Sequence, residues 1–95
     1  MELSISDLVR STAGRDQGKL FYVIGTEGVY VLIADGRERT LEHPKRKKLK
    51  HVRRVTRTES RVADKIKNGD KVLNSELRRD LAVFRRDHPC QNQGG

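Results

Sequence analysis

The first half of the chain alternates short apolar runs with turns that contain glycine. Residues 20–24 and 29–34 are rich in β-branched and aromatic side chains, and glycine lies at or near the ends of both runs. Runs of this length and composition favour strands over helices. A shorter run begins at Leu8, and Asp35-Gly36 predicts a tight turn into a returning strand over 37–41. Turns about every ten residues are typical of a small antiparallel barrel or sandwich.

The last third of the chain has helical spacing. Val62 and Ile66 lie four residues apart and predict a short helix. Ser60 or Thr58 is a suitable N-cap for this helix, and Asn68-Gly69 is a suitable end.

A second helix is expected to start at Asn74, because asparagine is a favourable N-cap residue. Leu77, Leu81 and Phe84 follow at positions i, i+4 and i+7 and form one apolar face. We expect this face to pack on the barrel, and a groove for a partner protein is the alternative. Pro89 is expected to end the helix.

Positive charge is concentrated in one segment of the chain. Residues 44–58 hold eight Lys or Arg and no acid, and the formal net charge of the whole protein is +8. Residues 1–43 carry −2, residues 44–67 carry +9 and residues 68–95 carry +1. This concentration favours binding to a polyanion, because each phosphate that a cation neutralises releases a condensed counterion. A nucleic acid is the preferred partner; an anionic membrane surface and a solvated charged loop are the alternatives.

The secondary structure of this basic segment is less regular. Leu49, Val52 and Val55 lie three residues apart, which suits neither a regular strand nor a full helical stripe. A short strand over 49–53 that completes the sheet is the preferred prediction, and a basic helix is the alternative. Leu49 and Val52 are expected to anchor the segment to the fold, so that its charges form one rigid stripe.

Composition limits the size of the hydrophobic core and indicates the cellular compartment. The 95 residues are 34% hydrophobic and 36% charged, with no Trp and a single cysteine, Cys90. We therefore expect one small domain whose core is mainly Val, Ile and Leu. A single cysteine excludes an internal disulfide, which fits the cytoplasm. No apolar run approaches the roughly 20 residues of a membrane span, and the first residues lack the layout of a signal peptide.

The sequence carries no pattern typical of catalysis or metal binding. His43, His51 and His88 are far apart and have no neighbouring cysteine or paired carboxylates. No P-loop, catalytic-triad pattern or H-E-x-x-H motif occurs. We predict a protein that is not an enzyme and that needs no metal or cofactor.

A loop with two glycines and two cations joins the first two predicted strands. It reads GRDQGK over residues 14–19. Glycine permits turn conformations that a Cβ disfavours. Arg15 and Lys19 are expected to project from the rim of this loop, near the basic segment, where they can contact a phosphate. A purely structural hairpin turn is the alternative interpretation.

Residues 8–34 resemble the KOW motif of ribosomal proteins and NusG-type transcription factors, which is a strand, a glycine turn of the kind G-[KR]-D-x-G-K and a second apolar strand. The matching positions are Gly14, Arg15, Asp16, Gly18, Lys19 and Val23. Phe21 stands where the commonest KOW pattern has a third glycine. In this respect the chain is more similar to the ribosomal protein L-fourteen-e family of archaea and eukaryotes, and to the short bacterial KOW proteins related to it.

Four features in order support this resemblance, which covers about residues 6–86. They are a GRDKG-like turn, an ADG turn, a PKRKKLKH-like segment and a final N-x-E-[IL]-R-R helix. The resemblance implies an SH3-like barrel and RNA binding in a ribosomal or translational setting. A protein-interaction module of the transcription or translation apparatus, as in NusG-like proteins, is the second hypothesis, because SH3-like barrels also bind proteins.

We therefore predict a mostly β fold, a small SH3-like (KOW) barrel with a C-terminal helical extension. The barrel is expected over 1–57, including the basic segment over 44–57; the helical extension is expected over 58–88 and a flexible tail over 89–95. The protein is expected to be a monomer that contacts the phosphate backbone of structured RNA, with ribosomal RNA as the preferred target and ribosomal proteins as further candidate partners. Tyr22 and Tyr30 are expected to pack between strands, and stacking on bases is the alternative.

The predicted site consists of cations from the glycine turn, the returning strand and the basic segment, together with three turn glycines. Alternation along the returning strand places Arg37 and Arg39 on one face. The predicted RNA-binding residues are Arg15, Lys19, Arg37, Arg39, Lys45, Arg46, Lys47, Lys48, Lys50, His51, Arg53 and Arg54, and the predicted turn glycines are Gly14, Gly18 and Gly36.

Overall fold

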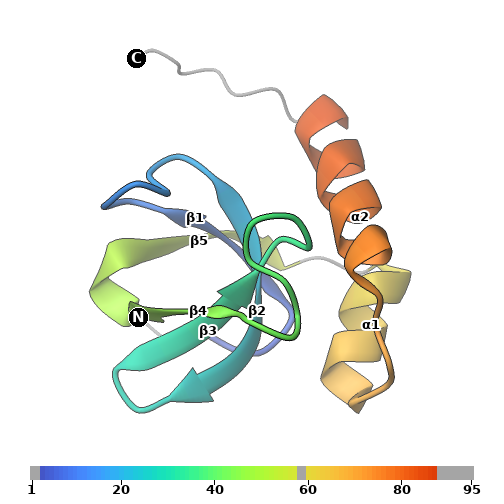
Figure 1. Cartoon of the computed structure of the whole chain (residues 1–95), viewed down its shortest axis with the longest axis horizontal. Helices are drawn as coiled ribbons and strands as arrows, with labels where there is room; N and C mark the ends of the chain where they lie inside the picture. Colours follow the sequence, from blue (N-terminus) through green and yellow to red (C-terminus); the bar gives the residue numbers. More distant parts are fainter. Residues whose placement is uncertain (1–2, 58–59, 88–95) are drawn as a thin grey trace.

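A curled antiparallel sheet followed by two helices makes up the computed structural model, which describes residues 3–57 and 60–87 (Figure 1). The strands are β1 (Asp7–Ser11), β2 (Leu20–Glu27), β3 (Tyr30–Ala34), β4 (Lys45–Lys48) and β5 (Val52–Arg57). A short 3-10 helix, η1 (Leu49–His51), joins β4 to β5, and the helices are α1 (Arg61–Asn68) and α2 (Asn74–Asp87). The predicted tail over 89–95, and with it Pro89, lies outside the described residues.

The five strands form one antiparallel sheet in the order β4-β3-β2-β1-β5. The sheet curls into an SH3-like half-barrel, and the two helices follow it in sequence and lie on one side of it (Figure 1). The predicted fold class, mostly β with C-terminal helices, is therefore confirmed. Neither helix in the described part of the chain is long and apolar enough to cross a membrane.

Both faces of β1, β2 and β3 carry buried side chains, and successive side chains of these strands point to opposite faces. One face lines the inside of the half-barrel with buried apolar side chains, which are Val9, Phe21, Val23, Val31, Ile33 and Val52. The other face packs against the helices with its own set, which is Leu8, Leu20, Tyr22 and Ala34. Leu77 and Leu81 of α2 are buried in this second layer and Phe84 packs beside it, so the prediction that this helix face covers the barrel is confirmed.

The predicted strand over 37–41 is wrong, because these residues form a loop. The Oδ1 atom of Asp35 accepts hydrogen bonds from the backbone N–H groups of Arg37 (2.9 Å) and Arg39 (3.0 Å). A side chain that bonds the backbone in this way competes with the hydrogen bonds of a strand ladder. The fourth strand begins instead at Lys45, and it pairs with β3.

The predicted strand over 49–53 is wrong for residues 49–51, which form a 3-10 helix, and confirmed for Val52 and Arg53, which begin the strand β5 that completes the sheet. The basic segment contains two strands, β4 and β5, which pair with opposite edges of the sheet, and η1 turns the chain from one to the other. The anchoring role expected of Leu49 and Val52 is confirmed: Leu49 packs against the inner core cluster and Val52 is only 3% exposed.

Helix α1 begins and ends as the sequence predicts. The Ser60 hydroxyl accepts a hydrogen bond from the backbone N–H of Ala63 (3.0 Å), and this bond satisfies one of the donors exposed at the start of the helix. At the other end, Gly69 has a φ of 76°, and the N–H of Asp70 bonds to the carbonyl of Lys65 (2.9 Å). Glycine adopts this left-handed conformation without the penalty of a Cβ.

Helix α2 starts at Asn74, but the Asn74 side chain does not cap it as predicted. Its Oδ1 atom accepts a hydrogen bond from the backbone N–H of Leu41 (2.8 Å), and its Nδ2 donates to Glu42 (2.8 Å). At the helix start, the Glu76 carboxylate accepts from the backbone N–H of Leu73 (2.9 Å), as the acid of a capping box does. Asn74 therefore ties the loop over 35–43 to the start of α2.

Gly36 brings the same loop into direct contact with α2. Its φ is 79°, and a Cβ added there would overlap the carbonyl oxygen of Asn74 and lie 3.0 Å from the Cβ of Leu77. The Nη1 atom of Arg78 donates a 2.6 Å hydrogen bond to the Gly36 carbonyl. Only glycine fits this approach, which fixes the loop between the sheet and the helix.

Candidate nucleic-acid interface

The glycine turn over 14–19 closes the hairpin of β1 and β2. Gly14 and Gly18 have φ values of 77° and 88°, in the left-handed region that favours glycine. The N–H of Gly18 donates to the carbonyl of Ser11 (2.8 Å), and the Nη1 of Arg10 donates to the carbonyl of Gly18 (2.8 Å). The turn is therefore held on both sides by the strands that it joins.

Thr12 and Ala13, which lead into the glycine turn, are hydrogen-bonded to the basic segment at two points. The N–H of Thr12 donates to the carbonyl of His51 in η1 (2.9 Å), and the Lys47 ammonium in β4 donates to the carbonyl of Ala13 (2.7 Å). Arg15 is exposed in this turn. Arg15 therefore lies in a turn whose leading residues are hydrogen-bonded to β4 and η1.

Asp16 is the centre of a buried charged cluster, the Asp16 cluster. Its side chain is only 5% exposed, and three cationic groups surround its Oδ2 atom: Arg39 at 3.6 Å, Lys45 at 3.8 Å and Lys47 at 4.0 Å. Three cations around one carboxylate leave this cluster with a net charge of +2. The cluster joins the glycine turn, the loop over 35–43 and β4.

The role of Asp16 was not predicted from the sequence. The pattern that indicates it is one acid between the two cations of the glycine turn, Arg15 and Lys19. A carboxylate in that place compensates part of the repulsion between the cations that converge on the turn.

Lys47 does not lie on the surface, so its assignment as a phosphate contact does not match its position. It is 7% exposed, and burial lowers the pKa of its ammonium group, an effect that Asp16 partly opposes. Lys45 and Lys47 lie on the same side of β4, whereas Arg46 and Lys48 lie on the other side and are exposed. The alternation of side chains along a strand therefore distinguishes Lys45 and Lys47 from the exposed pair, Arg46 and Lys48, within this run of four cations.

Several cations of the predicted stripe are exposed and uncompensated. Within the described residues, the side chains of Arg15, Lys48, Lys50 and Arg53 form neither an ion pair nor a hydrogen bond, and we call these four residues the open cations. They come from the glycine turn, β4, η1 and β5, respectively. His51 is half-buried between Lys50 and the start of β5 and contributes its backbone carbonyl to the turn.

Two further arginines of the stripe are partly compensated. Arg46 lies 3.9 Å from the Glu27 carboxylate, and its guanidinium lies over the ring of Tyr30 at 4.7 Å from the centroid. Arg54 lies 3.9 Å from the buried carboxylate of Asp7. Both arginines keep exposed surface, so they add positive charge to the surfaces of β4 and β5.

The tyrosines pack within the fold, as predicted. Tyr22 is 1% exposed, and its hydroxyl donates to the Asp80 carboxylate of α2, so it packs between the sheet and the helices rather than between strands alone. Tyr30 is half-buried beneath Arg46. Base stacking on Tyr22 is therefore excluded by its burial.

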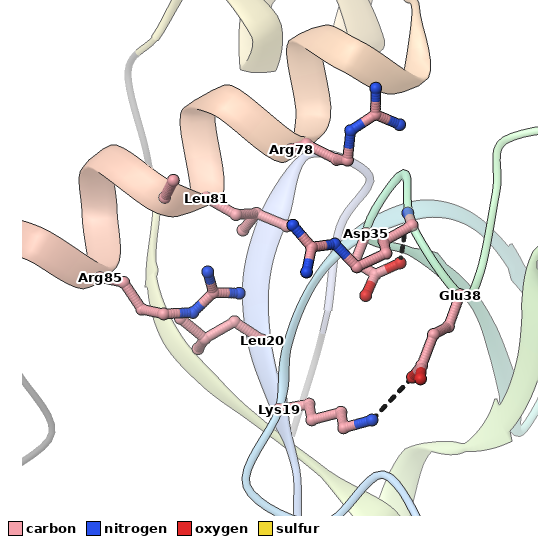
Figure 2. A pocket seen from close by; sticks show the side chains of 9 residues that line it. Lys19, Leu20, Asp35, Glu38, Arg78, Leu81 and Arg85 are labelled. Carbon is pink, nitrogen blue, oxygen red and sulfur yellow. Dashed lines mark hydrogen bonds and ion pairs between the residues drawn. The ribbon is translucent and has the colours of Figure 1, made fainter.

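Arg37 and Arg39 do not share a strand face, in contrast to the prediction, because they lie in the loop over 35–43. Arg39 turns toward Asp16, whereas Arg37 is exposed. Lys19 forms an ion pair with Glu38 (2.7 Å) at the surface. This hydrogen bond raises the pKa of Lys19 and lowers that of Glu38. Lys19, Arg37 and Glu38 line a cleft beside α2. Figure 2 shows this cleft.

Comparison with known proteins adds no family to this description. No protein-family model matches the chain, and no curated protein matches it in sequence. What the structure establishes is an SH3-like curled sheet with two C-terminal helices, in which a buried carboxylate gathers three cations. The four open cations are exposed on the glycine turn, β4, η1 and β5.

Proposed function

We propose that this protein is a non-catalytic module that binds the phosphate backbone of structured RNA. The observation that carries the proposal is the set of open cations, Arg15, Lys48, Lys50 and Arg53, on the glycine turn, β4, η1 and β5, which all belong to one hydrogen-bonded half-barrel. A fixed array of cations neutralises phosphates without first having to be ordered, and each contact releases counterions.

The resemblance to the KOW motif supports RNA as the polyanion. Ribosomal RNA and the translation machinery of the cytoplasm are the setting that this resemblance favours. Lys48 and Lys50 act as point charges on the backbone, so we expect recognition to follow the shape of the RNA more than its sequence.

Protein interaction through the apolar face of α2 is less well supported. Leu77 and Leu81 are 0% and 1% exposed because they pack on the sheet, so these two leucines offer no surface to a partner. A partner protein bound at another surface would stay associated after ribonuclease treatment, which is the outcome that favours this alternative.

The proposal is tested by reversing charge on the interface and, separately, on the helices. The interface variant is Lys48→Glu, Lys50→Glu and Arg53→Glu together. The control variant is Arg61→Glu, Lys67→Glu and Lys71→Glu, three exposed cations of α1 and of the segment that follows it, with the same change in net charge. In filter binding to total ribosomal RNA, we expect the interface variant to lose at least about a hundredfold in affinity and the control to lose much less. Equal losses would show that only net charge matters.

A further inference from the structure

A cleft lies between the half-barrel and α2, on the side of the glycine turn. Its volume is about 290 Å³. It is bounded by the start of β2, by the loop after β3 and by the side of α2 that carries Arg78, Ala82 and Arg85 (Figure 2). Its lining residues are Lys19, Leu20, Asp35, Arg37, Glu38, Arg78, Leu81, Ala82 and Arg85.

The cleft is positively charged. Four of its lining residues are cations and two are acids. Glu38 is occupied by Lys19 at 2.7 Å, and Oδ1 of Asp35 accepts two backbone hydrogen bonds of its own loop. Arg37 and Arg85 have no side-chain partner in the described part of the chain. The excess of two positive charges is therefore presented mainly by these two arginines.

The floor of the cleft is apolar. Leu20 and Leu81 are 3% and 1% exposed, and Ala82 lies beside them on α2. Arg78 and Arg85 are seven residues apart, about two helical turns, so they lie on the same side of α2 with Leu81 and Ala82 between them. Figure 2 shows Arg85 extended above Leu20.

We propose that this cleft binds one nucleotide unit of the RNA, with its phosphate held by Arg37 and Arg85 and its sugar against the exposed Ala82. The inference rests on the proposed function and extends the RNA contact from the half-barrel to α2. A guanidinium group presents paired donors that match two phosphate oxygens. The volume of about 290 Å³ is just below the range of about 300–1,000 Å³ for small-ligand pockets. A site of this size suits a single nucleotide unit and excludes a duplex.

Arg85 and Arg86 provide a matched pair for the test. Both are exposed arginines in the last turn of α2, and only Arg85 lines the cleft. Arg85→Glu and Arg86→Glu therefore change net charge and helix-end electrostatics equally. In filter binding to total ribosomal RNA at constant salt, we expect Arg85→Glu to lower affinity about tenfold and Arg86→Glu less than twofold. Circular dichroism checks that both variants keep the helix content of the parent.

A variant that is expected to raise RNA affinity, instead of lowering it, provides a second test. Glu38→Gln removes the negative charge beside Lys19, so it is expected to raise RNA affinity about twofold to fivefold. Asp70→Asn, the same change of charge at an exposed residue after α1, is the control and is expected to have a smaller effect.

The outcomes separate the cleft from the interface. Equal affinities for Arg85→Glu and Arg86→Glu, with RNA binding by the Lys48, Lys50 and Arg53 variant still impaired, would overturn the proposal that the cleft binds a nucleotide. The proposed function would still stand. Unchanged affinity in the interface variant would overturn the proposed function itself, whatever the helix variants do.

Discussion

Gly36→Ala tests how the structure holds the helices against the half-barrel. The substitution adds a Cβ to a residue with a φ of 79°, where a side chain costs about 1–2 kcal/mol in backbone strain. The same Cβ would overlap the Asn74 carbonyl oxygen and crowd Leu77, both in α2. Relieving such overpacking costs about 1–3 kcal/mol more. We therefore expect Gly36→Ala to lower the free energy of unfolding by about 2–5 kcal/mol, a large share of the about 5–15 kcal/mol typical of a folded domain.

Gly69→Ala separates the backbone strain from the clash. Gly69 has a nearly equal φ of 76°, but no atom lies within 4 Å of the position of its added Cβ. It is expected to cost only the strain, about 1–2 kcal/mol. Urea unfolding followed by far-ultraviolet circular dichroism measures both variants. Costs that agree within about 0.5 kcal/mol would refute the close contact of Gly36 with α2, whereas failure of Gly36→Ala alone to fold would support it.

Two further predictions concern a buried cation and a surface carboxylate. Lys47→Met is expected to lower the free energy of unfolding by about 1–2 kcal/mol, because it leaves the Ala13 carbonyl without its donor. It should change RNA affinity less than Lys48→Met does, and the reverse order in filter binding would contradict the burial of Lys47. The hydrogen bond from Asn74 lowers the pKa of Glu42, so its contribution to stability is present above its ordinary pKa of 4.5 and is lost as pH falls through the lower folded value. Urea unfolding between about pH 6 and pH 3 should show a smaller loss of stability for Glu42→Gln than for the parent. Equal losses would show that Glu42 does not contribute to the loss of stability at low pH.

The strands of the half-barrel could be predicted from sequence because local pattern and burial agree there. Residues 20–24 and 31–34 alternate between the inner core and the layer under the helices, and both faces require apolar side chains. The loop over 37–41 could not be predicted in this way, since the side chain of Asp35 takes the backbone donors that a strand would use. The turn at Leu49 likewise depends on which sheet edges β4 and β5 pair with, and this is set by the whole sheet.

The candidate site was only partly accessible to sequence reasoning. The basic segment and the glycine turn are visible as runs of charge and glycine, and the structure brings them together through Thr12 and Lys47. The burial of Lys47 follows from strand alternation, which a run of four cations conceals. The contribution of Arg85 depends on the docking of α2 beside the loop over 35–43, a contact between segments far apart in the chain.

The salt dependence of RNA binding tests the central claim most directly. The affinity for total ribosomal RNA is measured by filter binding between about 50 and 200 mM monovalent salt, for the parent and for the Lys48, Lys50 and Arg53 variant. Four open cations that each neutralise one phosphate predict a slope of log affinity against log salt of about −3 or steeper. The variant should show a slope shallower by about 2. A parent slope between 0 and about −1, or equal slopes for the two proteins, would contradict phosphate binding by this surface.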